Sequence, residues 1–187
     1  MIKSIPMTWT AEAFSLGYVA DYKPYNFVDG EGVRCSLYVS GCPFACRGCY
    51  NVAAQDFAYG SPYTKALEDQ IIEDLSADYC QGLTLLGGEP FLNTQVTLSL
   101  CKRVREVYGS TKDIWSWSGY TFEELINGSD DKVELLKLID VLVDGKFIEE
   151  KKDLNLAFRG SSNQKIIDVQ KSLQKDKLIL WKDGNYN

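Results

Sequence analysis

The sequence has no histidine, and this absence removes whole classes of functional site. Metal centres that depend on imidazole, including the common zinc hydrolase sites, are excluded, and so are Ser-His and Cys-His nucleophile pairs. Basic side chains are also outnumbered: 20 Lys and Arg stand against 26 Asp and Glu, for a formal charge of −6. No Lys/Arg-dense stripe is present to neutralise a phosphate backbone, so we expect no direct binding to nucleic acid.

A long apolar run is missing from the start of the chain. The first twenty residues include Pro6, Glu12 and several polar positions, so they predict neither a signal-peptide core nor a spanning helix. We therefore expect a cytoplasmic, reducing location and no contact with a membrane. In that setting the six cysteines favour metal binding or chemistry over disulfide bonds.

The length of 187 residues, with 45% hydrophobic residues, suits one domain over residues 1–187. Short apolar runs alternate with helical patterns, which predicts parallel strand and helix units. We expect strands at 33–39, 83–86, 113–118, 140–144 and 177–181, and helices at 64–79, 94–108, 121–126, 132–138 and 164–173. The first twenty-five and the last ten residues carry no clear pattern.

A complete eightfold barrel needs about 250 residues. The chain is shorter, so the sequence predicts an α/β fold in the form of an incomplete, laterally open (βα) barrel. Its site is expected at the carboxyl ends of the strands, where the open side could admit a loop from another protein.

Three cysteines lie within eight residues on a predicted loop, residues 40–51. Cys42, Cys46 and Cys49 have C-x3-C-x2-C spacing directly after the strand at 33–39. One loop of this kind can surround a cuboidal cluster. Three thiolates on a [4Fe–4S] cluster leave one iron without a protein ligand, which is the open position that chemistry at a metal requires.

The competing interpretation of the cysteine loop is a zinc knuckle or an ordinary electron-transfer cluster. In that case Cys35, Cys80 or Cys101 would supply a fourth ligand. If they do not, these three cysteines are expected to be small buried hydrophobic residues.

The cysteine spacing after the first strand, together with Gly87-Gly88-Glu89-Pro90 after the second, resembles the radical S-adenosylmethionine superfamily. Further sequence motifs are similar to those of the activating proteins of the anaerobic, class III ribonucleotide reductases, which are glycyl-radical-enzyme activases. The likeness runs from about residue 26 to 164, which leaves an N-terminal extension of about 1–25 and a C-terminal segment of about 165–187. The motifs that carry this likeness are residues 26–34, 39–42, 48–51, 86–90, 112–120, 143–147 and 159–164.

The resemblance implies two cofactors, a [4Fe–4S] cluster and S-adenosylmethionine. The reduced cluster would cleave S-adenosylmethionine, and the resulting radical would take a hydrogen atom from a glycine of the reductase large subunit. A low-potential electron donor such as flavodoxin would supply the electron. The alternatives are activation of another glycyl-radical enzyme and a non-catalytic iron–sulfur or zinc module.

The resemblance also assigns residues to the cofactor. Many members carry an aromatic residue directly before the third cysteine, where this chain has Gly48, and Tyr50 is the candidate substitute next to Cys49. Gly87 and Gly88 would let backbone approach the methionine end, and Glu89 or exposed carbonyls would accept from its ammonium group. A plain strand-to-helix turn is the alternative.

Asp144 and Lys146 end a predicted strand and match an Asp-x-Lys pair that resembles the ribose and carboxylate contacts of the activases. Charge complementarity suits Lys146 to a carboxylate, and a surface ion pair is the alternative. Ser116 and Ser118 are candidates either for cofactor contacts or for a solvent-facing side of the strand.

Three arginines remain open in role. Arg34 and Arg47 would balance an anionic cluster, meet the partner protein or be solvated. Arg159, with Asn163 and Gln164, would line an adenine pocket or bind the partner.

Overall fold

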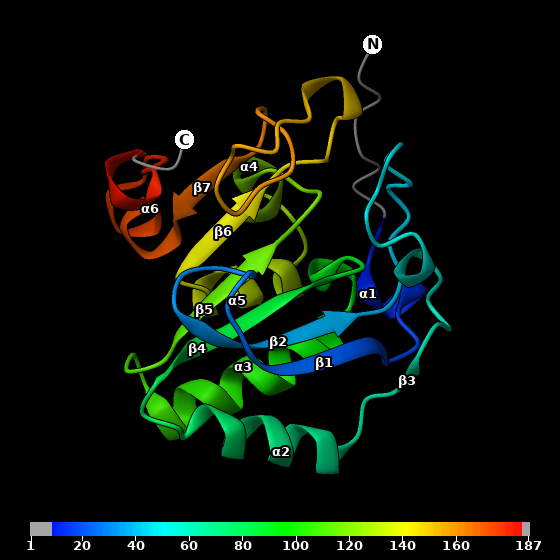
Figure 1. Cartoon of the computed structure of the whole chain (residues 1–187), viewed down its shortest axis with the longest axis vertical. Helices are drawn as coiled ribbons and strands as arrows, with labels where there is room; N and C mark the ends of the chain where they lie inside the picture. The colour runs from blue at the N-terminus through cyan, green and yellow to red at the C-terminus, as the bar shows by residue number, and fades with distance from the viewer. Residues whose placement is uncertain (1–8, 185–187) are drawn as a thin grey trace.

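The computed structural model describes residues 9–184, and its strands form one open sheet (Figure 1). The strand order is β3-β1-β2-β4-β5-β6-β7. Strands β2, β4, β5 and β6 are parallel, whereas β1, β3 and β7 are antiparallel to their neighbours. Their bounds are β1 Tyr18–Asn26, β2 Val33–Val39, β3 Ser61–Pro62, β4 Cys80–Gly87, β5 Asp113–Trp117, β6 Val141–Asp144 and β7 Lys165–Asp168.

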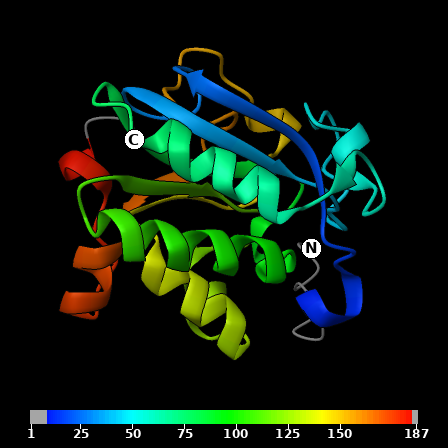
Figure 2. The same ribbon diagram turned by 90° about the horizontal axis from the view of Figure 1, so that it is seen from below.

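Helices α2, α3 and α5 lie on the same side of the sheet, as Figure 2 shows. They bury one apolar stripe each against strand residues such as Leu37, Leu83 and Leu85, which have no exposed surface. No helix of residues 9–184 is both long and apolar enough to cross a membrane. The helices are α1 Ala11–Phe14, α2 Lys65–Leu75, α3 Thr94–Tyr108, α4 Phe122–Ile126, α5 Asp130–Leu138 and α6 Val169–Lys175.

Helix starts follow the expected capping chemistry. The Thr64 side chain accepts from the backbone N–H of Leu67 at the start of α2. At α4, Thr121 and Glu124 form the capping box that the sequence predicts, each side chain accepting from the other residue's backbone N–H.

The sequence prediction is wrong at the C-terminal end. Residues 165–168 form β7, antiparallel to β6, and the helix begins only at Val169. The pair Ile166-Ile167 is buried as a strand; a run this short fits either a strand or a buried helical turn by its pattern. Residues 177–181 form no strand, because only Leu180 bridges to Ile167.

The α/β class is confirmed, and the sheet is mixed rather than wholly parallel. It has two edges, β3 and β7, and is not closed. The incomplete barrel of the expected type stays a prediction. Of the expected N-terminal extension, residues 1–8 lie outside the described residues, and the rest contains α1 and most of β1.

Candidate iron–sulfur and cofactor site

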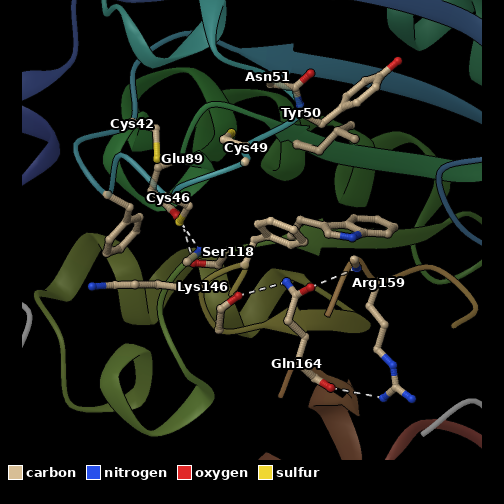
Figure 3. Close-up of a pocket in the computed structure, with 18 of the residues that line it drawn as sticks. Cys42, Cys46, Cys49, Tyr50, Asn51, Glu89, Ser118, Lys146, Arg159 and Gln164 are labelled. Atoms are coloured by element: carbon tan, nitrogen blue, oxygen red, sulfur yellow. Dashed lines mark hydrogen bonds between the residues drawn. The ribbon is translucent and has the colours of Figure 1, made fainter. Parts of the chain in front are cut away.

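A cavity of about 480 Å³ lies at the carboxyl ends of the parallel strands, where ligands of such sheets bind. Four segments line it: the cysteine loop after β2, the turn after β4, the end of β5 with the residues that follow it, and the long loop between β6 and β7. Figure 3 shows cysteines, Glu89 and Ser118 around it, with Arg159 and Gln164 toward the β7 end. The predicted residues on its lining are Cys42, Cys46, Gly48, Cys49, Tyr50, Gly87, Gly88, Glu89, Ser118, Lys146, Arg159 and Gln164.

The three loop cysteines are free thiols of intermediate exposure. Burial, and secondarily the Glu89 carboxylate, raises the pKa of the Cys42 thiol above its ordinary value. Burial, and secondarily Cys49, also raises the pKa of Cys46. Both thiols therefore hold their protons, and metal binding has to displace those protons to form thiolate ligands.

The other three cysteines lie elsewhere. Cys35, Cys80 and Cys101 are at most 2% exposed and belong to the main hydrophobic core. Cys35 and Cys80 face each other, with their sulfur atoms 3.7 Å apart. The interpretation of these residues as small buried hydrophobes is confirmed, and none of them lines the cavity.

The cysteine loop and the turn after β4 are tied backbone to backbone. The N–H of Gly88 donates to Val39 O at 2.7 Å, and the N–H of Glu89 donates to Gly41 O at 2.8 Å. A Cβ on Gly88 would lie 2.5 Å from the Gly41 oxygen, closer than such atoms approach. Glycine at 88 is therefore required by contact with the cysteine loop itself.

Glu89 is turned into the protein. Its side chain is 1% exposed and accepts from Ser118 Oγ at 2.9 Å, Gly119 N at 2.8 Å and Phe91 N at 3.1 Å. Burial raises the pKa of this carboxyl to about 7, although the Gly119 and Phe91 N–H groups partly oppose the shift. The carboxylate thus joins the turn after β4 to the end of β5.

Lys146 lines the cavity, but Asp144 does not. The Lys146 Nζ lies 4.9 Å from the centre of the Phe44 ring. Asp144 is buried and accepts from the N–H groups of Phe122 and Lys165, at 3.0 and 3.1 Å. The exposed ion pair considered for Asp144 and Lys146 is therefore wrong. Asp144 borders a neighbouring cavity of about 490 Å³.

The loop between β6 and β7 is held at its base by Gln164. Its Nε2 donates to Gly145 O at 2.9 Å, and its Oε1 accepts from Gly160 N at 3.0 Å. Arg159 lines the cavity and donates to the Gln164 carbonyl at 3.1 Å. Asn163 donates to the Lys146 carbonyl at 2.9 Å and borders the neighbouring cavity instead.

Arg34 lies at the opposite end of the sheet from the cysteines and has no exposed surface. It pairs with Asp113 at 2.5 Å and donates to Thr84 Oγ1 and the Leu83 carbonyl. Its proposed roles as a solvated residue or a counter-charge for the cluster are wrong, because it ties the amino ends of β2, β4 and β5 together. Arg47, by contrast, is exposed and pairs with Glu149 at 2.7 Å.

Ser116 in β5 and Ser118 directly after it are both buried, so the solvent-facing interpretation is wrong. Ser116 has no exposed surface, and Ser118 lines the cavity while donating to Glu89. Tyr50 projects outward from the cavity rim, and 98% of its surface is exposed.

The sequence alone did not indicate every residue of the cavity. Phe44, Leu154 and Leu156 line it as well. Phe44 stands between two of the cysteines, a position that could have marked it. Leu154 and Leu156 belong to an irregular loop that follows no helical or strand pattern, so no signal pointed to them.

The residues present fit a cluster with one open position. Three thiols on one loop border a shared cavity, and the remaining three of the six cysteines are packed in the core. Sulfur is the ligand that iron–sulfur clusters use, and no fourth cysteine competes for the remaining iron.

Comparison with known proteins agrees with this fit. A family model described as a 4Fe-4S single cluster domain matches residues 28–167. Three similar proteins are named anaerobic ribonucleoside-triphosphate reductase-activating protein. The one from Pasteurella multocida is 46% identical over 153 residues, covering 80% of this chain and 95% of the relative. The one from Escherichia coli K12 is 47% identical over 148 residues, 76% and 93% of the two chains.

The third, from enterobacteria phage T4, is 37% identical over 145 residues, covering 76% of this chain and 88% of the relative. The family model spans most of the chain, and the relatives are matched along almost their whole length. The chain therefore belongs to the anaerobic ribonucleoside-triphosphate reductase-activating protein family, with its 4Fe-4S single cluster domain.

Proposed function

We propose that the chain binds a [4Fe–4S] cluster and S-adenosylmethionine in the 480 Å³ cavity and generates a glycyl radical on an anaerobic ribonucleotide reductase. The observation that carries the proposal is the set of three cavity-lining thiols, Cys42, Cys46 and Cys49, with the other cysteines buried in the core. The names of the relatives support the choice of the reductase as protein substrate.

When bound and reduced, the cluster would supply the electron for reductive cleavage of S-adenosylmethionine, the chemistry by which a hydrogen atom would be removed from the target glycine. The protein's own part is to bind, orient and enclose. The three cysteines would hold the iron as thiolates, and the cavity walls would limit the access of water.

Lys146 is the residue we assign to the methionine carboxylate, because it places a cationic amine on the cavity wall. The turn at Gly87 and Gly88 offers backbone to the ammonium end: the Gly87 carbonyl lies beside the cavity, 3.4 Å from the Asn51 side-chain nitrogen. We assign Asp144 a positioning role, because its carboxylate fixes the end of β6 from which Lys146 extends.

The rim of the cavity suits contact with a second protein. Tyr50 and Leu154 are 98% and 87% exposed, and both line it. An apolar side chain exposed at the mouth of a site is a common feature of protein recognition. The proposal further includes a single domain of incomplete-barrel type, a low-potential electron donor such as flavodoxin, and a cytoplasmic setting.

The test is anaerobic reconstitution with iron and sulfide, followed by reduction in the presence of S-adenosylmethionine. We expect a brown protein that forms 5′-deoxyadenosine, and a glycyl radical signal by electron paramagnetic resonance when a class III reductase is added. A colourless protein that retains zinc would overturn the proposal. Cleavage of S-adenosylmethionine without a radical on the reductase would instead point to another glycyl-radical enzyme as the target.

A further inference from the structure

The N-terminal segment, residues 9–17, lies against the outer side of the cysteine loop. Figure 1 shows α1, in dark blue, beside the cyan loop that follows β2. The segment precedes residues 28–167, the part of the chain that the family model matches. Nothing in the sequence pattern indicated a role for it, so its contacts are the evidence.

The first contact reaches the loop between two cysteines. The Trp9 ring lies 5.5 Å from the Phe44 ring, centre to centre. Phe44 also meets Tyr120 edge-on at 4.9 Å, and a Cβ on Gly119 would lie 2.4 Å from the Phe44 ring. Because Phe44 stands between Cys42 and Cys46 and is packed between Trp9 and Tyr120, Trp9 limits the movement of this part of the loop.

The second contact lies on the other side of Cys42. Phe14 packs against Phe57 at 5.5 Å. The Phe57 ring in turn fills the space beside Gly41, where an added Cβ would come within 1.9 Å of it. Trp9 and Phe14 also touch each other, at 6.0 Å. The segment therefore supports the chain both before and after Cys42.

Hydrogen bonds at both ends of the segment attach it to the rest of the protein. Lys132 on α5 is 4% exposed and donates from Nζ to the Trp9 carbonyl at 2.5 Å. A buried ammonium group needs such a partner, so this bond is costly to lose. At the other end, Ser15 Oγ donates to Asn93 Oδ1 at 2.8 Å, and Asn93 donates to the Glu89 carbonyl at 3.0 Å.

We propose that Trp9 and Phe14 are positioning residues for the iron–sulfur cluster: they clamp the cysteine loop against the body of the protein. The inference rests on the proposed function, because it requires a cluster on Cys42, Cys46 and Cys49. Groups outside the ligand set fix the geometry of metal ligands, and their loss typically weakens metal binding by about 10- to 100-fold. Residues 9–17 would thus retain the cluster without contributing a ligand.

The test compares three variants of the full chain after anaerobic reconstitution. Trp9→Ala removes the clamp, Trp9→Phe keeps an aromatic ring, and Val104→Ala removes buried volume at the far end of α3, away from the loop. The readouts are the rate at which a chelator removes iron, the paramagnetic resonance spectrum of the reduced cluster, and the thermal stability of the cluster-free protein.

We expect Trp9→Ala to lose iron about tenfold faster than the unaltered chain and to broaden the spectrum of the reduced cluster. Trp9→Phe and Val104→Ala should stay close to the unaltered chain in both. Iron loss from Trp9→Ala at the unaltered rate would overturn the clamp alone. Equally fast loss from Val104→Ala would overturn it too, since general stability would then explain the effect. An unaltered chain that takes up no cluster would overturn the proposed function as well.

Discussion

Replacing the buried Glu89 by glutamine should change how the stability of the cluster-free protein depends on pH. Burial raises the pKa of this carboxyl from 4.5 to about 7 in the folded protein, with Lys132 and two backbone N–H groups opposing the shift. The folded state therefore binds the proton more tightly than the unfolded state does. The resulting stabilisation is fully present below the unfolded pKa of 4.5 and is lost as pH rises through about 7.

The size of the effect follows from the shift. A change from 4.5 to about 7 corresponds to about 3 kcal/mol between the two ends of the range. Glutamine does not titrate, so the variant lacks this term. It also offers one oxygen where the carboxylate accepts from Phe91, Ser118 and Gly119, which adds a pH-independent cost of about 1–3 kcal/mol for the unpaired donor.

The assay is urea unfolding of both proteins without cluster, under reducing anaerobic conditions, at several values from about pH 5 to about pH 8. We expect the unaltered protein to lose about 3 kcal/mol relative to Glu89→Gln across that range. Glu106→Gln, on the exposed side of α3, is the matched control and should track the unaltered protein. A stability difference between the unaltered protein and Glu89→Gln that stays constant with pH would refute the reasoning.

Three further predictions concern the cluster ligands, the cofactor contact at Lys146 and the buried ion pair of Arg34. Cys46→Ala should abolish cluster assembly and S-adenosylmethionine cleavage together, whereas Cys101→Ala should keep its full iron content. Iron analysis and the 5′-deoxyadenosine assay check both variants. Cleavage that survives in Cys46→Ala would contradict the assignment of Cys46 as a cluster ligand. Lys146→Ala should weaken S-adenosylmethionine binding about tenfold by calorimetry with the cluster retained, for loss of a charge contact worth about 1.4 kcal/mol. Arg34→Met should lower the unfolding free energy by about 3 kcal/mol, because Asp113 loses its charged partner. Unchanged denaturant midpoints would contradict this structural role of Arg34.

The sequence predicted the parallel centre of the sheet and the placing of the cysteine loop. Strands such as 33–39 and 140–144 are bounded by glycine or follow an apolar alternation, so the local sequence pattern is enough to predict them. The capping box at Thr121 and Glu124 is also a local signal, since the two side chains and backbone groups concerned are three residues apart. Cys42, Gly88 and Lys146 each follow a strand of the parallel set, and the carboxyl ends of parallel strands meet at one edge of the sheet, so their grouping could be predicted.

Features set by distant contacts could not be predicted. Strand β1 contains Lys23 and Pro24, and beyond Val19 it pairs with β2 alone, so its sequence carries the charge and proline of an unpaired strand side and resembles a loop. The burial of Arg34 depends on groups on β4 and β5 that meet it only after folding. The orientation of Asp144 could not be predicted for the same reason, because its side chain accepts hydrogen bonds from the backbone of α4 and β7 and does not line the cavity.

The paired hydrogen bonds between the two glycine-containing loops constrain how this site can change over time. Gly88 and Glu89 hold Val39 and Gly41 through main-chain atoms, and any Cβ at position 88 would collide with the Gly41 oxygen, so each loop is fitted to the backbone of the other. A cysteine loop transplanted from a relative would have to travel with its own copy of residues 86–90 to seat correctly. Engineers and natural recombination alike would have to move these two motifs as a single inherited block.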